Sequence, residues 1–292
     1  MEKVLKPALT LLIKTYCPLA KPRIILGNVI TAAGGFFLAA RGQLDFLLLI
    51  AMLTGISLVI GSACVFNNYI DREHDKKMHR TKNRALAKGD VHIGRTLLHA
   101  GVLVVLGVAI LALYANLLTA GIAAFGFLVY VLAYSFLKYK TVHATLIGSI
   151  AGATPPVIGY VAVTGQIDFA AFIIFAIITF WQMPHFFAIA IYRIKDYTKA
   201  AVPLLPIKKG IRRTKIQMAL YCIAYLLALA ALSFFGFVGL GFLVLNTLFG
   251  LRWLWLCMQG FRCDNDVQWA RGVFLFSLVV VTVLCLSIPF ST

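Results

Sequence analysis

Long apolar stretches alternate with polar ones along almost the whole chain. A helix of about 20 residues crosses the hydrocarbon core of a membrane, and nine of the apolar stretches are of roughly this length. We therefore predict nine membrane-spanning helices, over residues 24–40, 46–66, 96–113, 117–137, 142–163, 169–192, 217–235, 236–256 and 272–290. The seventh and eighth meet at the glycine-rich stretch FFGFVGLG, but their combined length predicts two helices rather than one.

The polar stretches between the predicted helices are very unequal in length. Several are turns of a few residues, whereas 71–95 and 193–216 are long loops that begin acidic and continue basic. These loops follow the second and sixth helices, so they lie on the same side, where we expect the chemistry. The pattern predicts an all-α integral membrane protein whose single domain, residues 24–290, surrounds a central cavity open to the cytoplasmic side.

Three prolines, Pro155, Pro156 and Pro184, lie inside the predicted fifth and sixth helices. Each removes a backbone hydrogen-bond donor from its helix. A membrane protein tolerates this where neighbouring groups or cavity water satisfy the freed carbonyls. The prolines indicate either packing kinks or an opening of the central cavity.

Composition and charge agree with a membrane location. The 292 residues are 61% hydrophobic with a mean hydropathy of +0.92, which excludes an ordinary water-soluble domain. The net charge of +17 is typical of nucleic-acid-binding chains. If the helices alternate from a cytoplasmic N-terminus, however, 26 of the 27 Lys and Arg residues lie on the cytoplasmic side and only Arg41 lies outside. The positive-inside rule therefore explains the charge, and we expect no nucleic-acid partner and an external C-terminus.

The first 23 residues contain a short apolar stretch broken by Lys14 and Pro18. It lacks the uninterrupted apolar core and the cleavage site of a signal peptide, so we expect residues 1–23 to form a cytoplasmic, interfacial segment. It is also not an Arg/Ser-rich import sequence, which favours the bacterial cytoplasmic membrane over a mitochondrial one. The six cysteines contain no CxxC pair, so thiolate metal sites and disulfides are weak hypotheses.

Polar residues at the end of the second predicted helix form the first candidate site. Asn67, Asp71 and Asp75 are four residues apart and share one face of a continuing helix, with Asn68 beside them. Oxygen ligands in this arrangement suit a hard cation such as Mg²⁺, which usually binds one or two carboxylates and a substrate phosphate. A solvated helix end would show the same spacing without binding a metal.

Basic residues follow this acidic face closely, and they favour a diphosphate ligand because cationic side chains bind phosphate oxygens. A further basic pair ends the fourth predicted helix. The candidate diphosphate-binding residues are Lys76, Arg80, Lys82, Arg84, Lys138 and Lys140.

A second candidate group lies on the sixth predicted helix. His185, Tyr192 and Asp196 are seven and eleven positions apart, so they share a helix face. An ionisable residue inside a membrane segment indicates a functional site, although a lone histidine is also common as a hydrogen-bonded core residue. Arg193 and Lys195 add positive charge next to Asp196.

These stretches resemble a known family. NNYIDREHDKKMHRTKNRALAKG is similar to the first aspartate-rich motif of the intramembrane (UbiA-type) aromatic prenyltransferases, whose form is ND-x-x-D-x-x-x-D followed by R-T-x-N-R. The stretches KPRIILGNVITAAGGF, LIGSIAGATPPVIGYVAVTG, WQMPHFFAIAIYRIKDY and VPLLPIKKG resemble the haem-farnesylating branch. The resemblance extends from about Lys21 to Phe276.

The resemblance implies a function and a set of roles. A farnesyl group would pass from farnesyl diphosphate to a vinyl group of haem b, with addition of water, to give haem O for a downstream haem-modifying enzyme or an oxidase. Asn67, Asn68, Asp71, Asp75 and Asp196 would bind Mg²⁺. The candidate catalytic set consists of Asn67, Asp71, Asp75, His185, Tyr192 and Asp196. Haem propionates would contact Arg23, Lys138, Arg193 and Lys195, while His185 either ligates the haem iron or orients the attacking water.

The chain departs from the broader family at two places. Asn68 stands where most members carry a second aspartate, and His185 and Tyr192 replace an aspartate motif on the sixth helix while Asp196 is kept. These replacements are typical of the haem-modifying branch and argue against a phenolic or quinone-precursor acceptor. That acceptor is the first alternative; a secondary transporter and a passive scaffold for an oxidase are the others.

Overall fold

The computed structural model describes residues 17–291, so most of the interfacial segment predicted over residues 1–23 lies outside the described residues. The described part is all-helical, and nine of its helical segments are long and apolar enough to span a membrane. They are α2 (Pro22–Ala40), α3 (Phe46–Asp75), α5 (Ile93–Tyr114), α6 to α7 (Leu117–Leu137), α8 and α9 (Ala144–Thr164), α10 (Phe169–Tyr192), α13 (Ile211–Phe234), α14 with η3 (Leu240–Arg262) and α15 with η4 (Asp266–Phe290). The prediction of nine spanning helices is confirmed.

The helix ends differ from the predicted ones mainly on the side of the long loops. The helix α3 continues beyond residue 66 to Asp75, so the acidic positions are helical as their spacing requires. The helices α13 and α15 begin at Ile211 and Asp266, six residues before the apolar stretches, because polar turns extend them. Asn265 caps the start of α15, since its side chain accepts hydrogen bonds from two backbone amides. The seventh and eighth spans are separate helices, as predicted.

Two of the spans are interrupted. The fifth span breaks at Ala153 between α8 (Ala144–Gly152) and α9 (Thr154–Thr164), and Pro155 and Pro156 lie in the first turn of α9, where a missing amide is tolerated. The fourth span contains a π-helical turn, η2 (Val129–Tyr134), between α6 (Leu117–Leu128) and α7 (Ser135–Leu137). Pro184, in contrast, lies within an uninterrupted α10.

Small residues allow two helices to cross very closely. A Cβ atom added at Gly35 would lie 1.9 Å from the carbonyl oxygen of Pro156, and one added at Gly159 would lie 1.9 Å from that of Ala32. Only glycine fits at these positions. The crossing therefore fixes α2 against α9, consistent with the packing of small residues in membrane helix pairs.

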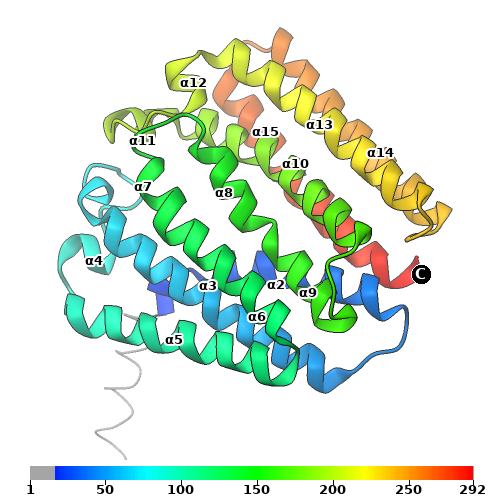
Figure 1. Cartoon of the computed structure of the whole chain (residues 1–292). Helices are drawn as coiled ribbons and strands as arrows, with labels where there is room; N and C mark the ends of the chain where they lie inside the picture. Colours follow the sequence, from blue (N-terminus) through cyan, green and yellow to red (C-terminus); the bar gives the residue numbers. More distant parts are fainter. Residues whose placement is uncertain (1–16, 292) are drawn as a thin grey trace, which may run out of the picture.

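The long loops gather at one end of the helix bundle. In Figure 1, the short helices α4 (Ala85–Lys88), α11 (Ile194–Lys199) and α12 (Leu205–Lys208) lie along the left and upper-left side, and the C-terminus lies at the opposite end, on the right. We call the end that carries these short helices the loop end. Met78, from the loop after α3, packs with Ala200 and Val202, from the loop after α10, so the two long loops touch.

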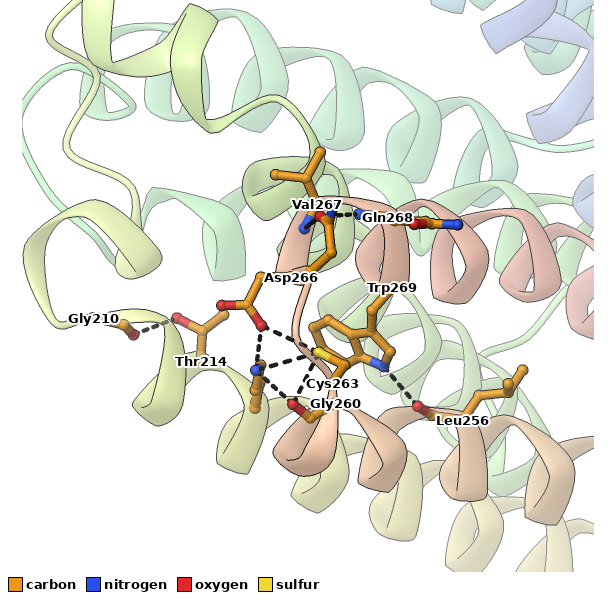
Figure 2. Close-up of polar contacts among 11 residues, drawn as sticks. Gly210, Thr214, Leu256, Gly260, Cys263, Asp266, Val267, Gln268 and Trp269 are labelled. Carbon is orange, nitrogen blue, oxygen red and sulfur yellow. Dashed lines mark hydrogen bonds and ion pairs between the residues drawn. The ribbon is translucent and has the colours of Figure 1, made fainter.

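A buried lysine ties α13 to the turn between α14 and α15 at the loop end. Lys215 donates to the carbonyl oxygen of Gly260 at 2.6 Å and to the carboxylate of Asp266, and its Nζ lies 3.9 Å from the thiol of Cys263. Figure 2 shows these three acceptors converging on one point, with the indole of Trp269 beside them. All three donors of the lysine thus have a partner, which we interpret as a structural lock.

Candidate active site

The polar end of α3 is buried, although it is built from asparagine and aspartate. Asn67, Asn68, Asp71 and Asp75 are each 6% exposed or less. Asn67 donates to the hydroxyl of Ser135 at 3.0 Å, and Asn68 donates to the backbone carbonyl of Leu19 at 2.8 Å. The predicted helix face is therefore a face that packs inside the protein and not a solvated helix end.

Asp71 is held by two residues that follow the fourth span. Lys138 donates to Oδ2 of Asp71 at 2.5 Å, and the hydroxyl of Tyr139 donates to Oδ1 at 2.8 Å. The ring of Tyr139 stacks on His74 at a centroid distance of 3.7 Å. Lys138, predicted from its charge alone, is thus brought to the acidic face, and Tyr139 joins it.

Asp75 is paired on one side only. Arg84 donates to its Oδ2 at 2.7 Å, but its Oδ1 is buried without a hydrogen-bond partner, as is Oδ1 of Asn68. An unpartnered buried oxygen is costly, so these two oxygens are candidate ligands for a cation. Asn68 and Asp75 are seven positions apart, two helical turns, so both oxygens belong to the same helix face.

This donor set fits Mg²⁺. The ion prefers oxygen ligands and typically uses one or two carboxylates, with water and substrate phosphate completing its coordination. Asp71, Asp75 and the amide oxygen of Asn68 supply such a set, and two of these residues have an oxygen that lacks a partner. Among residues 17–291 no group of three or more His, Cys, Asp and Glu side chains could hold a metal by itself, so a site here needs the amides and a substrate.

Lys21 is a site residue that the sequence pattern predicts only as part of the positive charge before the first helix. Its Nζ donates to Oδ1 of Asn67 at 2.8 Å. Its backbone has φ 53° and ψ 67°, a left-handed conformation that costs a residue with a Cβ atom about 1–2 kcal/mol. The sequence signal that could have identified it is the KPR triplet, because Pro22 fixes the start of α2 and leaves Lys21 at the turn before it.

Burial changes the proton affinity of the charged groups beside the spans. Burial lowers the pKa of Lys21 to about 8, and it also lowers the pKa of Lys138, although Asp71 acts in the opposite direction. Burial raises the pKa of Tyr139, and its hydrogen bond to Asp71 acts in the same direction. The two lysines are cations with little hydration, which favours their pairing with an anion.

The second group is organised by α10 and α15. His185 is 8% exposed, its ring stacks on Trp181 at 4.8 Å, and its Nδ1 lies 2.7 Å from the hydroxyl of Ser277. The indole of Trp181 donates to the backbone carbonyl of Ser277 at 2.9 Å, and Phe274 lies 5.1 Å from the histidine ring. His185 is therefore held tightly between two helices.

Tyr192 lies at the loop end of α10 between two arginines. The guanidinium carbons of Arg193 and Arg271 are 4.4 Å and 5.9 Å from the centroid of its ring. Arg271 belongs to α15, as does Ser277, and no local motif around either residue indicates a partnership with α10. Asp196 is half-buried in α11, one short helix further along the chain.

The remaining candidates lie at the surface of the loop end. Lys76 forms an exposed ion pair with Glu73 at 2.9 Å. The other exposed candidates are Arg23, Arg80, Lys82, Lys140 and Lys195. They add positive charge to the surface and make no ion pair within the described residues.

Comparisons with known proteins identify the family of the chain. The model of the UbiA prenyltransferase family matches residues 28–279. The chain belongs to the UbiA prenyltransferase family. A Protoheme IX farnesyltransferase of Protochlamydia amoebophila is 49% identical over 279 residues, covering 96% of this chain and 99% of the relative. A protein of the same name from Edwardsiella ictaluri is 47% identical over 283 residues, covering 96% of each.

Solved structures share the UbiA fold at low sequence identity. A digeranylgeranylglyceryl phosphate synthase superposes with a TM-score of 0.79 at 17% identity, covering 95% of this chain and 97% of its own. A UbiA homologue from Archaeoglobus fulgidus, bound to GPP and Mg²⁺, superposes with a TM-score of 0.70 at 13% identity. The match covers 94% of this chain and 99% of the homologue. The chain is therefore a multi-pass membrane prenyltransferase, and the expected all-α fold with nine spanning helices and the expected reaction class are confirmed.

Proposed function

We propose that the protein transfers a farnesyl group from farnesyl diphosphate to a vinyl group of haem b, with addition of water, to give haem O. The observation that carries the proposal is the end of α3, where two buried carboxylates and two partnerless oxygens lie beside Lys21, Arg84 and Lys138. Such a site suits a diphosphate bound with a metal ion. The choice of haem b is supported by the name of relatives 47–49% identical over nearly the whole chain.

The metal of this site would be Mg²⁺, as in the Archaeoglobus homologue. Asp71, Asp75 and the amide oxygens of Asn67 and Asn68 would hold it, with Asp196 contributing from α11. When bound, Mg²⁺ neutralises charge on the phosphate oxygens and so improves the leaving group.

The protein's own cations would stabilise the diphosphate as it leaves. The bond between the allylic carbon and the phosphate oxygen breaks, and its electron pair stays on the diphosphate. Arg84 and Lys138 are placed to donate charge-assisted hydrogen bonds to this anion, and Lys21 adds a third cation. Lys76, Arg80, Lys82 and Lys140, at the surface, would attract the substrate to the loop end.

Aromatic side chains near Lys138 would protect the allylic cation from water. Tyr130 and Tyr134 stack at 5.3 Å in the π-helical turn, and Nζ of Lys138 lies 5.3 Å from the ring of Tyr134. Electron-rich ring faces stabilise a nearby cation. The allylic carbon then bonds to the outer vinyl carbon, water oxygen bonds to the inner one, and a base accepts the proton that water loses.

The haem would bind beside α10 and α15. Arg193 and Arg271 flank Tyr192, where they could neutralise the propionates together with Lys195 and Arg23 from the surface. His185 faces the same region and would either ligate the iron or act on the attacking water. We place the protein in the bacterial cytoplasmic membrane with the loop end in the cytoplasm, because this end carries the positive charge.

The proposal is tested by expressing the protein in a bacterial host that lacks haem O and determining the masses of the extracted haems. We expect a new haem that exceeds haem b by one farnesyl group and one water. An Asp71→Asn variant made at the same level is the control for the site. Only haem b from membranes that contain the folded protein would contradict the proposal, and prenylation of an added phenolic acceptor would replace it.

A further inference from the structure

The contacts of Ser277 determine how the imidazole of His185 can react. The hydroxyl of Ser277 donates to the backbone carbonyl of Phe274 at 2.6 Å. A serine hydroxyl has one hydrogen, so the oxygen of Ser277 can only accept in its contact with Nδ1 of His185 at 2.7 Å. Nδ1 must therefore carry the proton.

The second nitrogen of the ring is left free. Nε2 of His185 has no hydrogen-bond partner among the described residues, and it is not one of the fully buried, partnerless atoms of residues 17–291. It therefore reaches accessible space. In a neutral imidazole with Nδ1 protonated, Nε2 carries a lone pair and no hydrogen.

The ring cannot easily turn to exchange these roles. Three aromatic rings surround the imidazole. The distances between ring centroids are 4.8 Å to Trp181, which stacks on it, 5.1 Å to Phe274 and 5.5 Å to Phe186. Ser277 is itself fixed, because it is fully buried and its carbonyl accepts the indole hydrogen of Trp181. A 180° rotation of the ring about its Cβ–Cγ bond would put the carbon Cδ2 in the place of Nδ1, so only the observed orientation keeps the hydrogen bond to Ser277.

We propose that Ser277 is a positioning residue for His185, holding the imidazole with Nδ1 protonated and Nε2 free to accept a proton or to coordinate a metal ion. A histidine that binds a metal commonly donates its other N–H to a fixed acceptor, which sets the tautomer and the ring orientation. The inference rests on the proposed function for the identity of the acceptor, haem b. In this neutral form, Nε2 of His185 cannot donate a hydrogen bond to the diphosphate or to the propionates.

The tautomer is measured without any substrate. In detergent-solubilised protein with ¹⁵N-labelled histidine, the six histidines give ring signals, and His185→Gln identifies those of His185. We expect a protonated Nδ1 and a non-protonated Nε2 in the wild type, and loss of this single form in Ser277→Ala. A protonated Nε2 in the wild type, or an unchanged spectrum in Ser277→Ala, would overturn the proposal.

Turnover then tests the consequence for the reaction. We expect Ser277→Ala to lower kcat/KM for haem b by about 10- to 100-fold, the usual loss when the partner of a metal-binding histidine is removed. KM for farnesyl diphosphate should not change, and Ser277→Thr, which keeps the hydroxyl, should recover most of the activity. Equal activity of Ser277→Ala and wild type would overturn the positioning role.

Thr282→Val is the matched control. Thr282 lies on the same helix and donates to the backbone carbonyl of Leu278, but its side chain is exposed. The Thr282→Val variant should leave both the histidine ring signals and the turnover unchanged. If the wild type makes no haem O while the expected tautomer is found, the proposed function fails and the assignment of Ser277 to His185 stands.

Discussion

Two lysine–aspartate pairs at the loop end have the same chemistry but different surroundings. Lys215 uses all three of its donors, on Asp266, Gly260 and Cys263. Lys138 has a hydrogen bond to Asp71 alone, and the neighbouring helix face contains oxygens without partners. Spare hydrogen-bonding capacity in a buried place costs stability, so it is retained where a ligand completes it. The comparison separates a structural lock from a binding site.

The strongest test of this comparison changes the oxygen that lacks a partner. We expect Asp75→Asn to lower haem O formation by at least about 100-fold, because the neutral amide removes a charge that would hold the metal and diphosphate. The melting temperature in detergent should also fall, because the ion pair of Asp75 with Arg84 loses its negative charge, so haem O is compared per folded molecule. Normal haem O levels in membranes with this variant would assign Asp75 to structure.

A second test concerns the lysine of the proposed binding site. Lys138→Met should lower kcat/KM for farnesyl diphosphate by about 10- to 100-fold, since a charge-assisted hydrogen bond to the leaving group is lost. Lys138→Arg should keep part of the activity because it keeps the charge. The measurement is steady-state turnover with radiolabelled farnesyl diphosphate, and equal values for the Met and Arg variants would argue against a role of charge.

A smaller effect is expected at Arg271, which neither lysine pair involves. Arg271→Gln should raise KM for haem b about 3- to 10-fold and leave kcat nearly unchanged. The reason is that one exposed cation that would face a propionate carboxylate is lost. Arg262→Gln, an exposed arginine near the same loop end, is the control. A KM for haem b that rises equally in both variants would indicate a general effect of charge.

The smallest effect on turnover is expected from the lock. Lys215→Met leaves three acceptors without their donor, so the melting temperature should fall by several degrees, corresponding to about 1–3 kcal/mol. Haem O formation per folded molecule should stay within about 2-fold of wild type. Unfolding followed by tryptophan fluorescence gives the first quantity, and a specific loss of turnover without loss of stability would reassign Lys215 to the active site.

Local spacing predicted a good part of the site. Asn67, Asp71 and Asp75 are four residues apart, and the structure has them buried together on one side of α3. Spacing could not identify Lys21, Tyr139 or Ser277, because their partners lie 46, 68 and 92 positions away. Charge identified Lys138 but not its partner, and it gave the exposed Lys76 and Lys82 the same weight.

The sequence by itself determined the nine spanning helices and the gathering of both long loops at one end of the bundle, because apolar length fixes each span separately and successive spans alternate in direction. It also determined which polar residues share a helix face, since the helical repeat is local. Only the tertiary structure decided which charges are paired and which oxygens stay unpartnered. Those outcomes depend on distant helices meeting, as α2 meets α9 through glycine and α10 meets α15 through His185 and Ser277.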